Sequence, residues 1–251
     1  MLKVLLSGCF GKVCIEVANE IRKMKDIEVT SGVDICRDLK ADFPTYTTFD
    51  DVENKPDVIV DFSNPSNLDD LLEYSLNNNV PVVIATTGYS DEQINKIKDA
   101  SSKIPVFFTF NMSLGVNLLV NLARTAAKVL GDGFDIEIIE KHHNQKIDAP
   151  SGTALMLADA INSALDDRLP YDFDRHSKRE KRKKDELGIH SERGGTIDDE
   201  HEVIFAGHDE VITLSHSAQS KALFATGAIK AAQFLASQKP GMYDMNSVLN
   251  I

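Results

Sequence analysis

Short apolar segments alternate with amphipathic ones through the first 111 residues, and no other feature of the sequence constrains the fold as strongly. The apolar runs are near-continuous, as strands are when both faces of their sheet are covered. Most of these runs are separated by segments whose apolar residues recur at helical spacing. Strands are expected at 3–8, 27–34, 56–63, 80–88 and 104–111, and helices at 12–24, 67–79 and 90–101. This order predicts a parallel sheet with helices on both faces.

The order of elements changes after residue 112. The last two strands expected there are joined through His208-Asp209, which fits a hairpin. Residues 166–200 are polar and poorly periodic, and they carry no pattern that predicts an element. Helices are expected at 118–129, 152–165 and 224–238, and strands at 134–143, 202–207 and 210–218. The predicted fold class is therefore α/β, followed by an α+β part on an open mixed or antiparallel sheet.

The turn between the first strand and the first helix carries a glycine pattern. Gly8 and Gly11 stand in the segment SGCFGKVC, and Cys14 takes the place where a third glycine often packs helix against strand. One glycine permits the tight turn, and the other lets a pyrophosphate approach the helix N-terminus. Asp34, at the end of the second strand, is placed to accept hydrogen bonds from an adenosine ribose. These residues indicate a Rossmann-type dinucleotide-binding domain, with an ordinary turn as the alternative.

The residue after Asp34 bears on the choice of cofactor. It is Ile35 rather than a base, whereas the 2′-phosphate of NADPH favours arginine or lysine. Arg37 is close enough to keep NADPH open. We therefore expect NADH to serve at least as well as NADPH. Small and hydroxyl residues at 61–67 and 85–90 suit a nicotinamide and its ribose, although ordinary turns use the same residues.

The segment EKHHNQKIDAPSGTA (140–154) places titratable cations just before an expected helix. A single histidine at the end of a strand is more often part of the core. Here His142 and His143 are followed by Lys146, which favours a site instead. Histidine alone among these groups has an unperturbed pKa near neutrality, so a histidine is the candidate proton donor.

The expected helix start after Pro150 adds an anion site. Ser151 is a natural N-cap, and the first N–H groups of a helix, here those of Gly152 and Thr153, have no partner within the helix. Lysine, imidazole and a helix N-terminus together favour the binding of more than one carboxylate. From these residues alone we expect a nicotinamide-linked reductase that acts on a small polycarboxylate.

The segment EIIEKHHNQKIDAPSGTA resembles the signature of the dihydrodipicolinate reductase (4-hydroxy-tetrahydrodipicolinate reductase) family of the diaminopimelate–lysine pathway. The family pattern His-His-x-x-Lys-x-Asp-Ala-Pro-Ser-Gly-Thr-Ala is matched at each position. The likeness extends over nearly the whole chain and includes DFSNP, ATTGYS, FNMSLGVN and SHSAQSKALFATGA. It implies an NAD(P)H-dependent reduction of 4-hydroxy-tetrahydrodipicolinate to tetrahydrodipicolinate.

The resemblance also implies roles for individual residues. His142 matches the proposed proton donor, which protonates ring C3 after hydride reaches C4, and Lys146 matches its catalytic partner. The residues implied to bind substrate are His143, Lys146, Ser151, Gly152 and Thr153. The residues implied to contact the cofactor, with no metal, are Gly8, Cys9, Phe10, Gly11, Lys12, Val13, Asp34, Ala85, Thr86, Thr87, Thr109, Phe110, Asn111 and Met112.

The family architecture implies two domains and a homotetramer. Residues 1–112 and 222–251 would form the dinucleotide-binding domain, and 113–221 the substrate-binding and oligomerisation domain. A hinge would close on the substrate. Two residues depart from the family pattern. Cys14 replaces the third glycine, which puts the packing around the pyrophosphate in doubt, and Lys221 stands where many relatives have arginine, so a bidentate contact would be lost.

The net charge of −12 argues against a partner that is nucleic acid or an anionic membrane surface. Seven Lys/Arg gather at 175–184, where we expect a solvated, mobile loop rather than a nucleic-acid patch, because no aromatic residues are interleaved. The three cysteines show no disulfide or zinc spacing. No apolar run approaches the roughly 18 residues of a membrane span. A cytoplasmic location is therefore expected.

Two other functions remain open from the sequence. A non-catalytic dinucleotide-binding sensor could use the same fold, and it would keep its function after His142→Ala. A dehydrogenase acting on a semialdehyde would use a nucleophilic cysteine in the substrate half. There is no cysteine after Cys36, which counts against that class.

Overall fold

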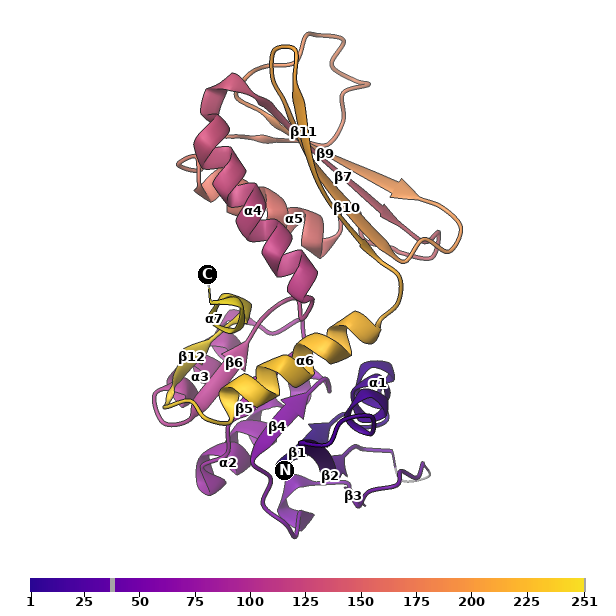
Figure 1. Ribbon diagram of the computed structural model, residues 1–251, viewed down its shortest axis with the longest axis vertical. Helices are drawn as coiled ribbons and strands as arrows, with labels where there is room; N and C mark the ends of the chain where they lie inside the picture. Colours follow the sequence, from indigo (N-terminus) through magenta and orange to yellow (C-terminus); the bar gives the residue numbers. More distant parts are fainter. Residues whose placement is uncertain (37–38, 251) are drawn as a thin grey trace. The chain divides into compact units, whose positions relative to one another are not determined.

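The computed structural model describes residues 1–36 and 39–250. The chain divides into two compact units. Unit 1 comprises Met1–Leu114 and Lys221–Ile251, and unit 2 comprises Gly115–Ser220. Each unit has its own sheet and hydrophobic core (Figure 1). Within the described residues, no helix has the length and apolar character that a membrane crossing requires.

Unit 1 is built on a seven-stranded sheet in the order β12-β6-β5-β4-β1-β2-β3. All its strand pairs are parallel, which confirms the predicted parallel sheet. The order reverses between β1 and β4, and doubly wound sheets bind ligands at such a point. The strands are β1 (Leu2–Ser7), β2 (Ile27–Val33), β3 (Thr45–Tyr46), β4 (Val58–Asp61), β5 (Val82–Ile84), β6 (Pro105–Phe108) and β12 (Gly241–Tyr243).

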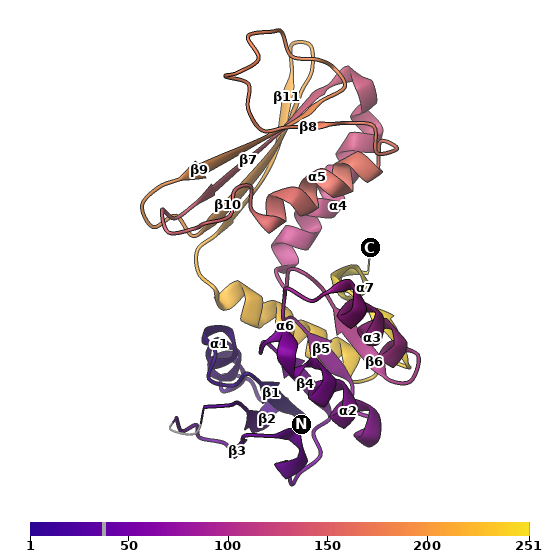
Figure 2. The same cartoon turned by 180° about the vertical axis from the view of Figure 1, so that it is seen from behind.

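Helices cover both faces of this sheet (Figure 2). They are α1 (Lys12–Ile21), α2 (Leu68–Asn78), α3 (Asp91–Ser101), α6 (Ala222–Leu235) and the short α7 (Met245–Leu249). Val4 and Leu6 of β1 pack with α1 and α6, whereas Leu5 between them packs with α2 and α3. Because both faces are buried, nearly all residues of the central strands β4, β5 and β6 are apolar, which explains the near-continuous runs in the sequence.

The strands of unit 1 end in one row. Ser7 pairs with Val33 on one side and with Asp61 on the other. Asp61 pairs with Ile84, and Ile84 pairs with Phe108. The loops that follow these five residues therefore begin at the same edge of the sheet.

Unit 2 is built on a five-stranded sheet in the order β11-β10-β7-β9-β8. Its strands are β7 (Asp135–His142), β8 (Tyr171–Asp172), β9 (Leu187–Arg193), β10 (Asp199–Ala206) and β11 (Val211–Ala218). β9 runs parallel to β7 and β8, whereas β10 is antiparallel to β7 and β11. The open mixed sheet and the β10–β11 hairpin are thus confirmed. Both helices of this unit, α4 (Leu114–Leu130) and α5 (Gly152–Ser163), lie on one face of the sheet (Figures 1 and 2).

Several elements carry too little pattern to be predicted. Residues 166–200, which gave no prediction, contain β8, β9 and the start of β10. β8 and β3 have two residues each, and only the first half of β9 is buried and apolar. β12 and α7 near the C-terminus were missed for the same reason, since they span three and five residues.

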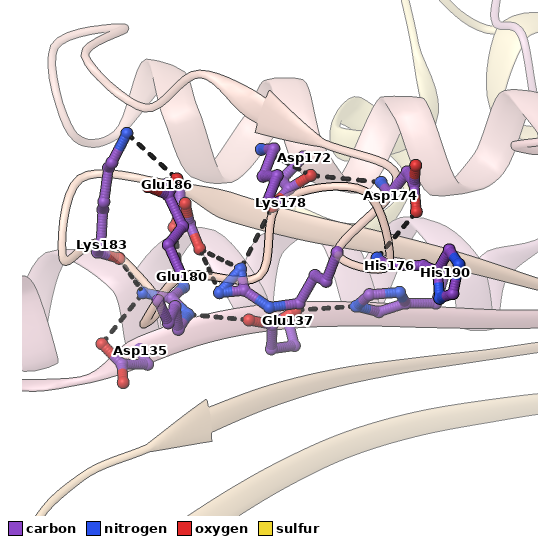
Figure 3. A network of polar contacts seen from close by, with 12 residues as sticks. Asp135, Glu137, Asp172, Asp174, His176, Lys178, Glu180, Lys183, Glu186 and His190 are labelled. Carbon is purple, nitrogen blue, oxygen red and sulfur yellow. Dashed lines mark hydrogen bonds and ion pairs between the residues drawn. The ribbon is translucent and has the colours of Figure 1, made fainter.

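The prediction for 175–184 is wrong in part, because ion pairs hold this segment against the sheet (Figure 3). Arg182, whose side chain is 16% exposed, donates to the Glu137 carboxylate at 2.8 Å and to backbone carbonyls of Ile136 and Glu186. Arg175 donates to the carboxylate of Glu186. The two arginines are therefore structural contacts of unit 2, not solvated charges.

Candidate active site

The glycine loop after β1 requires glycine at its first position. Gly8 has a φ of +76°, and a Cβ there would lie 2.7 Å from the Phe62 carbonyl oxygen. The Gly8 N–H donates to the Val33 carbonyl at 2.8 Å, and the Gly11 N–H donates to the Gly8 carbonyl at 2.9 Å. The loop is therefore a tight turn against the ends of β2 and β4.

The start of α1 is suited to an anion. Gly11 is the N-cap and contributes no side-chain cap, and the first turn contains no acidic residue. The first N–H groups of the helix and the positive end of its dipole thus face no carboxylate of their own helix. These residues fit the pyrophosphate of a dinucleotide, as Gly8 to Val13 were expected to do.

The two cysteines of this loop point into the protein. Cys14 is fully buried, and its Sγ lies 3.5 Å from the Ser7 carbonyl oxygen, to which it donates. Cys9 is 3% exposed, and burial raises the pKa of its thiol to about 12. Cysteine therefore packs in the core where the third glycine was expected, and Cys9 can meet a cofactor only through its backbone.

Asp34 connects the glycine loop to the end of β2. Its Oδ2 accepts from the Phe10 N–H and its Oδ1 from the Cys36 N–H, both at 3.0 Å. A carboxylate at this strand end is the group that accepts from a ribose in dinucleotide-binding folds. Arg37, which kept NADPH open, lies outside the described residues.

A buried carboxylate that no sequence pattern predicted lies at the end of β4. Asp61 is fully buried, and its two oxygens accept from the hydroxyls of Ser63 and Thr86, each at 2.6 Å. Burial raises its pKa above the usual aspartate range. The Thr86 hydroxyl is thus occupied inside the protein, while the neighbouring Thr87 is exposed. Asp61 therefore anchors the segment of Ala85 to Thr87, which was expected to contact the cofactor.

The segment after β6 packs against α6. The Thr109 hydroxyl donates to the Asn111 carbonyl at 3.1 Å, and the Phe110 side chain is 66% exposed. Met112 is buried, and a Cβ on Gly227 would lie 1.7 Å from the Met112 carbonyl oxygen. This segment therefore presents Phe110 to solvent while α6 holds its other side.

His142 is a buried member of the site in unit 2. It ends β7, whose residues alternate in burial, so its side chain faces the same side as Glu140. Its Nδ1 lies 2.6 Å from Glu140 Oε2, and its Nε2 lies 3.7 Å from Asp199 Oδ2. Burial lowers the pKa of His142, and this effect outweighs the two carboxylates that raise it.

Glu140 is the centre of this cluster. It is fully buried, and its two oxygens accept from Arg193 Nη1 and Nη2 at 2.8 and 2.7 Å. Oε1 also accepts from the Ser151 N–H at 3.1 Å. Burial alone would raise the pKa of Glu140, but Arg193 and its other donors lower it to about 2. The carboxylate therefore stays ionised at neutral pH.

The contacts of Glu140, His142, Asp199, His201 and Ser151 form a closed ring. Ser151 Oγ lies 2.9 Å from His201 Nε2, and His201 Nδ1 lies 2.8 Å from Asp199 Oδ1. Asp199 Oδ2 lies 3.7 Å from His142 Nε2, and the Ser151 N–H donates to Glu140 Oε1. His142, Asp199 and His201 each offer a possible metal-ligand atom within 4.8 Å of one another. Hydrogen-bond contacts take up one nitrogen of each ring, His142 Nδ1 with Glu140 and His201 Nε2 with Ser151.

The structure gives Lys146 a partner of its own. Its Nζ donates to both oxygens of Asp148 at 2.8 Å, and the side chain is 20% exposed. His143 is partly buried, and its Nδ1 has no hydrogen-bond partner among the described residues. Lys146 therefore forms an ion pair with Asp148 and does not contact His142 directly. A bound carboxylate could replace Asp148 as the partner of Lys146.

The predicted helix start at Ser151 is confirmed. Ser151 is the N-cap of α5, and its Oγ accepts from the Ala154 N–H at 3.1 Å. Apart from its two chain neighbours and the backbone of α5 itself, no heavy atom of the described residues lies within 4 Å of where a Cβ on Gly152 would stand. The first turn of α5 therefore leaves room for a ligand at the positive end of the helix.

His142 and Ser151 were predicted from the sequence, whereas the residues that connect them were not. Glu140 could have been found, because residues two apart on a strand share a face. Asp199 and His201 share a face of β10 for the same reason. They lie at and just beyond the end of the segment 166–200, for which the sequence predicted no strand. Arg193 on β9 carried no signal, since only the strand pairing His142↔Arg193 brings it close.

Two family models match consecutive parts of the chain. Residues 2–112 match the model described as "Dihydrodipicolinate reductase, N-terminus", and residues 115–249 match "Dihydrodipicolinate reductase, C-terminus". A protein of Caldanaerobacter subterraneus subsp. tengcongensis is 50% identical over 249 residues, covering 99% of this chain and 98% of its own length. One of Clostridium novyi is 44% identical with the same coverage. Both are named 4-hydroxy-tetrahydrodipicolinate reductase.

Solved structures are similar as well. The chain superposes on "Dipicolinate bound Dihydrodipicolinate reductase from Paenisporosarcina sp. TG-14" with a TM-score of 0.83, at 25% identity and 98% coverage of both chains. An amine dehydrogenase from Mycobacterium smegmatis gives a TM-score of 0.65 at 10% identity, covering 98% of this chain and 95% of that one, and shares the fold alone.

Proposed function

The chain belongs to the dihydrodipicolinate reductase family, and we propose that it reduces 4-hydroxy-tetrahydrodipicolinate to tetrahydrodipicolinate with NADH or NADPH. Family members carry this activity in their names, so the chain is an oxidoreductase of diaminopimelate and lysine biosynthesis. One observation carries the proposal: the chain matches both family models in order over nearly all its length. The chain therefore contains both the N-terminal and the C-terminal region of the family, to which we assign the cofactor and the substrate respectively.

We assign the dinucleotide to unit 1. The support is the row of strand ends, the turn at Gly8 and the start of α1, which offer small residues, backbone N–H groups and a helix dipole at one edge of the sheet. Asp34 would accept from the adenosine ribose. The segments 85–87 and 109–112 begin at the same edge and would border the nicotinamide ring. When bound, the reduced nicotinamide supplies a hydride.

We assign the dicarboxylate substrate to unit 2. The support is the cation of Lys146, the Nδ1 of His143 and the first turn of α5, which has open space at Gly152. Lys146 would exchange the carboxylate of Asp148 for one of the substrate. Two separate anion sites suit a ring with two carboxylates.

His142 is the acid in the proposed mechanism. The C4 hydroxyl and a proton from C3 leave as water, which forms a C3–C4 double bond. Hydride adds to C4, and the electrons of that double bond move toward the ring nitrogen. His142 then gives its Nε2 proton to C3, which completes the addition of hydride and proton across that bond. Lys146 holds a carboxylate and stabilises the negative charge that develops in the ring.

The reaction is tested by mixing the protein, freshly generated substrate and either cofactor, and following absorbance at 340 nm. We expect the cofactor to be oxidised only when the substrate is present. No oxidation with either cofactor would overturn the proposal. His142→Gln should abolish most of the turnover while leaving cofactor binding intact.

We propose that NADH is at least as good a cofactor as NADPH, because Asp34 at the end of β2 would repel a 2′-phosphate. The Michaelis constants for NADH and NADPH, measured in one buffer, test this choice. Asp34→Asn should weaken the preference for NADH. A large preference of the unmodified protein for NADPH would show that a cationic group outweighs Asp34.

We further propose a homotetramer assembled through the sheet of unit 2. The support is that both helices of this unit cover one face of the sheet, and that Val211 and Ile212 on the edge strand β11 are 63% and 37% exposed. Light scattering of the purified protein should give four chain masses. A cytoplasmic location also stays a prediction.

A further inference from the structure

We infer that Glu140 is a positioning residue of this enzyme: its carboxylate fixes the orientation and tautomer of His142 and ties that imidazole to the start of α5. The inference deepens the proposed function and rests on it, since it concerns the residue assigned as the acid. All the contacts that carry it lie within unit 2.

The first step is the contact between the two side chains. Glu140 Oε2 and His142 Nδ1 are 2.6 Å apart, and both residues are buried. An ionised carboxylate can only accept, so the hydrogen of this contact belongs to Nδ1. In the neutral ring Nε2 is then bare, and in the charged ring Nε2 carries the proton that can move. The same pairing of a carboxylate with the far nitrogen orients histidines in many sites.

The second step is what keeps Glu140 in its ionised form. Arg193 donates to both oxygens in a bidentate pair, and the Ser151 N–H donates to Oε1. Arg193 and the Ser151 N–H can only donate, so they favour a carboxylate that offers lone pairs over a protonated Glu140. Arg193 also donates to the Asp148 carbonyl at 2.7 Å, and so holds the residue that pairs with Lys146.

The third step is the connection to the substrate site. Ser151 uses its N–H for Glu140 and its Oγ for the first turn of α5 and for His201. One carboxylate therefore binds both the proposed acid and the N-cap of the helix proposed to hold a substrate carboxylate. A change at Glu140 should displace both.

The charged and titratable groups around His142 come from three strands. Glu140 is on β7, Arg193 on β9, and Asp199 and His201 on β10. Asp199 approaches Nε2 at 3.7 Å, too far for a hydrogen bond, so it favours the charged ring without holding the proton. Of these groups, Glu140 is the one that forms a hydrogen bond with the His142 ring.

The tautomer of His142 can be measured without any assay of activity. Two-dimensional ¹H–¹⁵N spectra of the histidine-labelled protein distinguish Nδ1–H from Nε2–H in a neutral ring, and His142→Gln assigns the signals. Above the pKa of His142 we expect the hydrogen on Nδ1 in the unmodified protein. A neutral ring with its hydrogen on Nε2 would overturn the inference, whether or not the proposed reaction is found.

Variants test the consequence for the reaction. Glu140→Gln keeps an acceptor but removes the charge, and its amide can donate to Nδ1 and reverse the tautomer. We expect kcat to fall about 100-fold, the lower end of what general acid catalysis contributes. The KM for NADH should stay within about twofold, and the alkaline limb of the pH profile should move to lower pH. Glu140→Asp should recover part of the activity.

Glu137→Gln is the matched control. Glu137 stands three residues earlier on β7 and also pairs with an arginine and a histidine, Arg182 and His190. Figure 3 draws Glu137 and His190 among the polar contacts of this region. If both variants lose activity equally with unchanged pH profiles, Glu140 has a structural role only. If Glu140→Gln does not fold, the tautomer of the unmodified protein decides.

Discussion

The buried position of His142 has a measurable consequence at the scale of the single residue. Burial lowers the pKa of this imidazole below its ordinary value of 6.5, despite Glu140 and Asp199. An acid works only in its protonated form, and that form decreases tenfold per pH unit above the pKa. We therefore expect kcat/KM for the dicarboxylate to fall with rising pH, along a limb that starts below pH 6.5.

The measurement is kcat/KM between pH 5 and 9 at constant ionic strength, since this ratio reports groups of the free enzyme. His142→Gln should remove the limb along with most of the activity. A limb centred well above pH 6.5 would show that another group supplies the proton.

The charge of Lys146 is a second property of one residue that can be tested. Lys146→Met keeps the length of the side chain but removes the cation proposed to hold a substrate carboxylate. A hydrogen bond to a charged group contributes about 1.5–3 kcal/mol, so kcat/KM for the substrate should fall roughly 10- to 100-fold. The KM for NADH should not change.

Lys141→Met provides the control for this change. Lys141 precedes His142 on β7, and its side chain lies on the opposite face of the strand from His142. It pairs with Glu202 at 3.3 Å. Equal losses for the two variants in titrations with the substrate would mean that lysine charge acts only through the overall field of the protein.

Residues that bind through a short motif were easier to predict than those that meet through strand pairing. Ser151 and its helix start were predicted because the N-cap and the helix are adjacent in sequence. Arg193 reaches Glu140 from 53 residues away, and His201 reaches Ser151 from 50 away. Such contacts depend on the register of β7, β9 and β10, which no local pattern contains.

At the scale of the element, length and burial on both faces decided what could be predicted. The buried strands of unit 1 gave continuous apolar runs, and α3 showed its start because Ser90 and Gln93 form a capping box. β3, β8 and β12 have two or three residues, too few for any periodicity. They exist because a neighbouring strand offers an edge to pair with.

The close packing of α6 gives a prediction for one helix. A Cβ on Gly227 would lie 1.7 Å from the Met112 carbonyl oxygen, a backbone atom that cannot turn aside. Gly227→Ala should therefore lower the free energy of unfolding by about 3 kcal/mol or more, at or beyond the upper range for overpacking. Urea unfolding followed by circular dichroism measures it.

Thr226→Ala, on an exposed position of the same helix, should change stability by less than about 0.5 kcal/mol. If Gly227→Ala were equally mild, α6 could not pack on the Asn111–Met112 segment as closely as the structure has it.

At the scale of the whole molecule, the chain carries a net charge of −12 and yet is proposed to bind two anionic ligands. The overall field repels both ligands, so local groups must supply the attraction: the start of α1 in unit 1, and Lys146 with the start of α5 in unit 2. These groups are few and lie in known segments. Each ligand should therefore protect a different, short part of the chain.

Hydrogen exchange followed by mass spectrometry tests this division. NADH alone should slow exchange in peptides covering 7–13 and 85–89, and dipicolinate alone, the ligand of the similar Paenisporosarcina structure, should slow it in 142–154. At a ligand concentration of 100 Kd the added stability is about 2.7 kcal/mol, which limits the slowing to roughly 100-fold. Protection of the glycine loop by dipicolinate, with none at 142–154, would contradict the assignment of the substrate to unit 2.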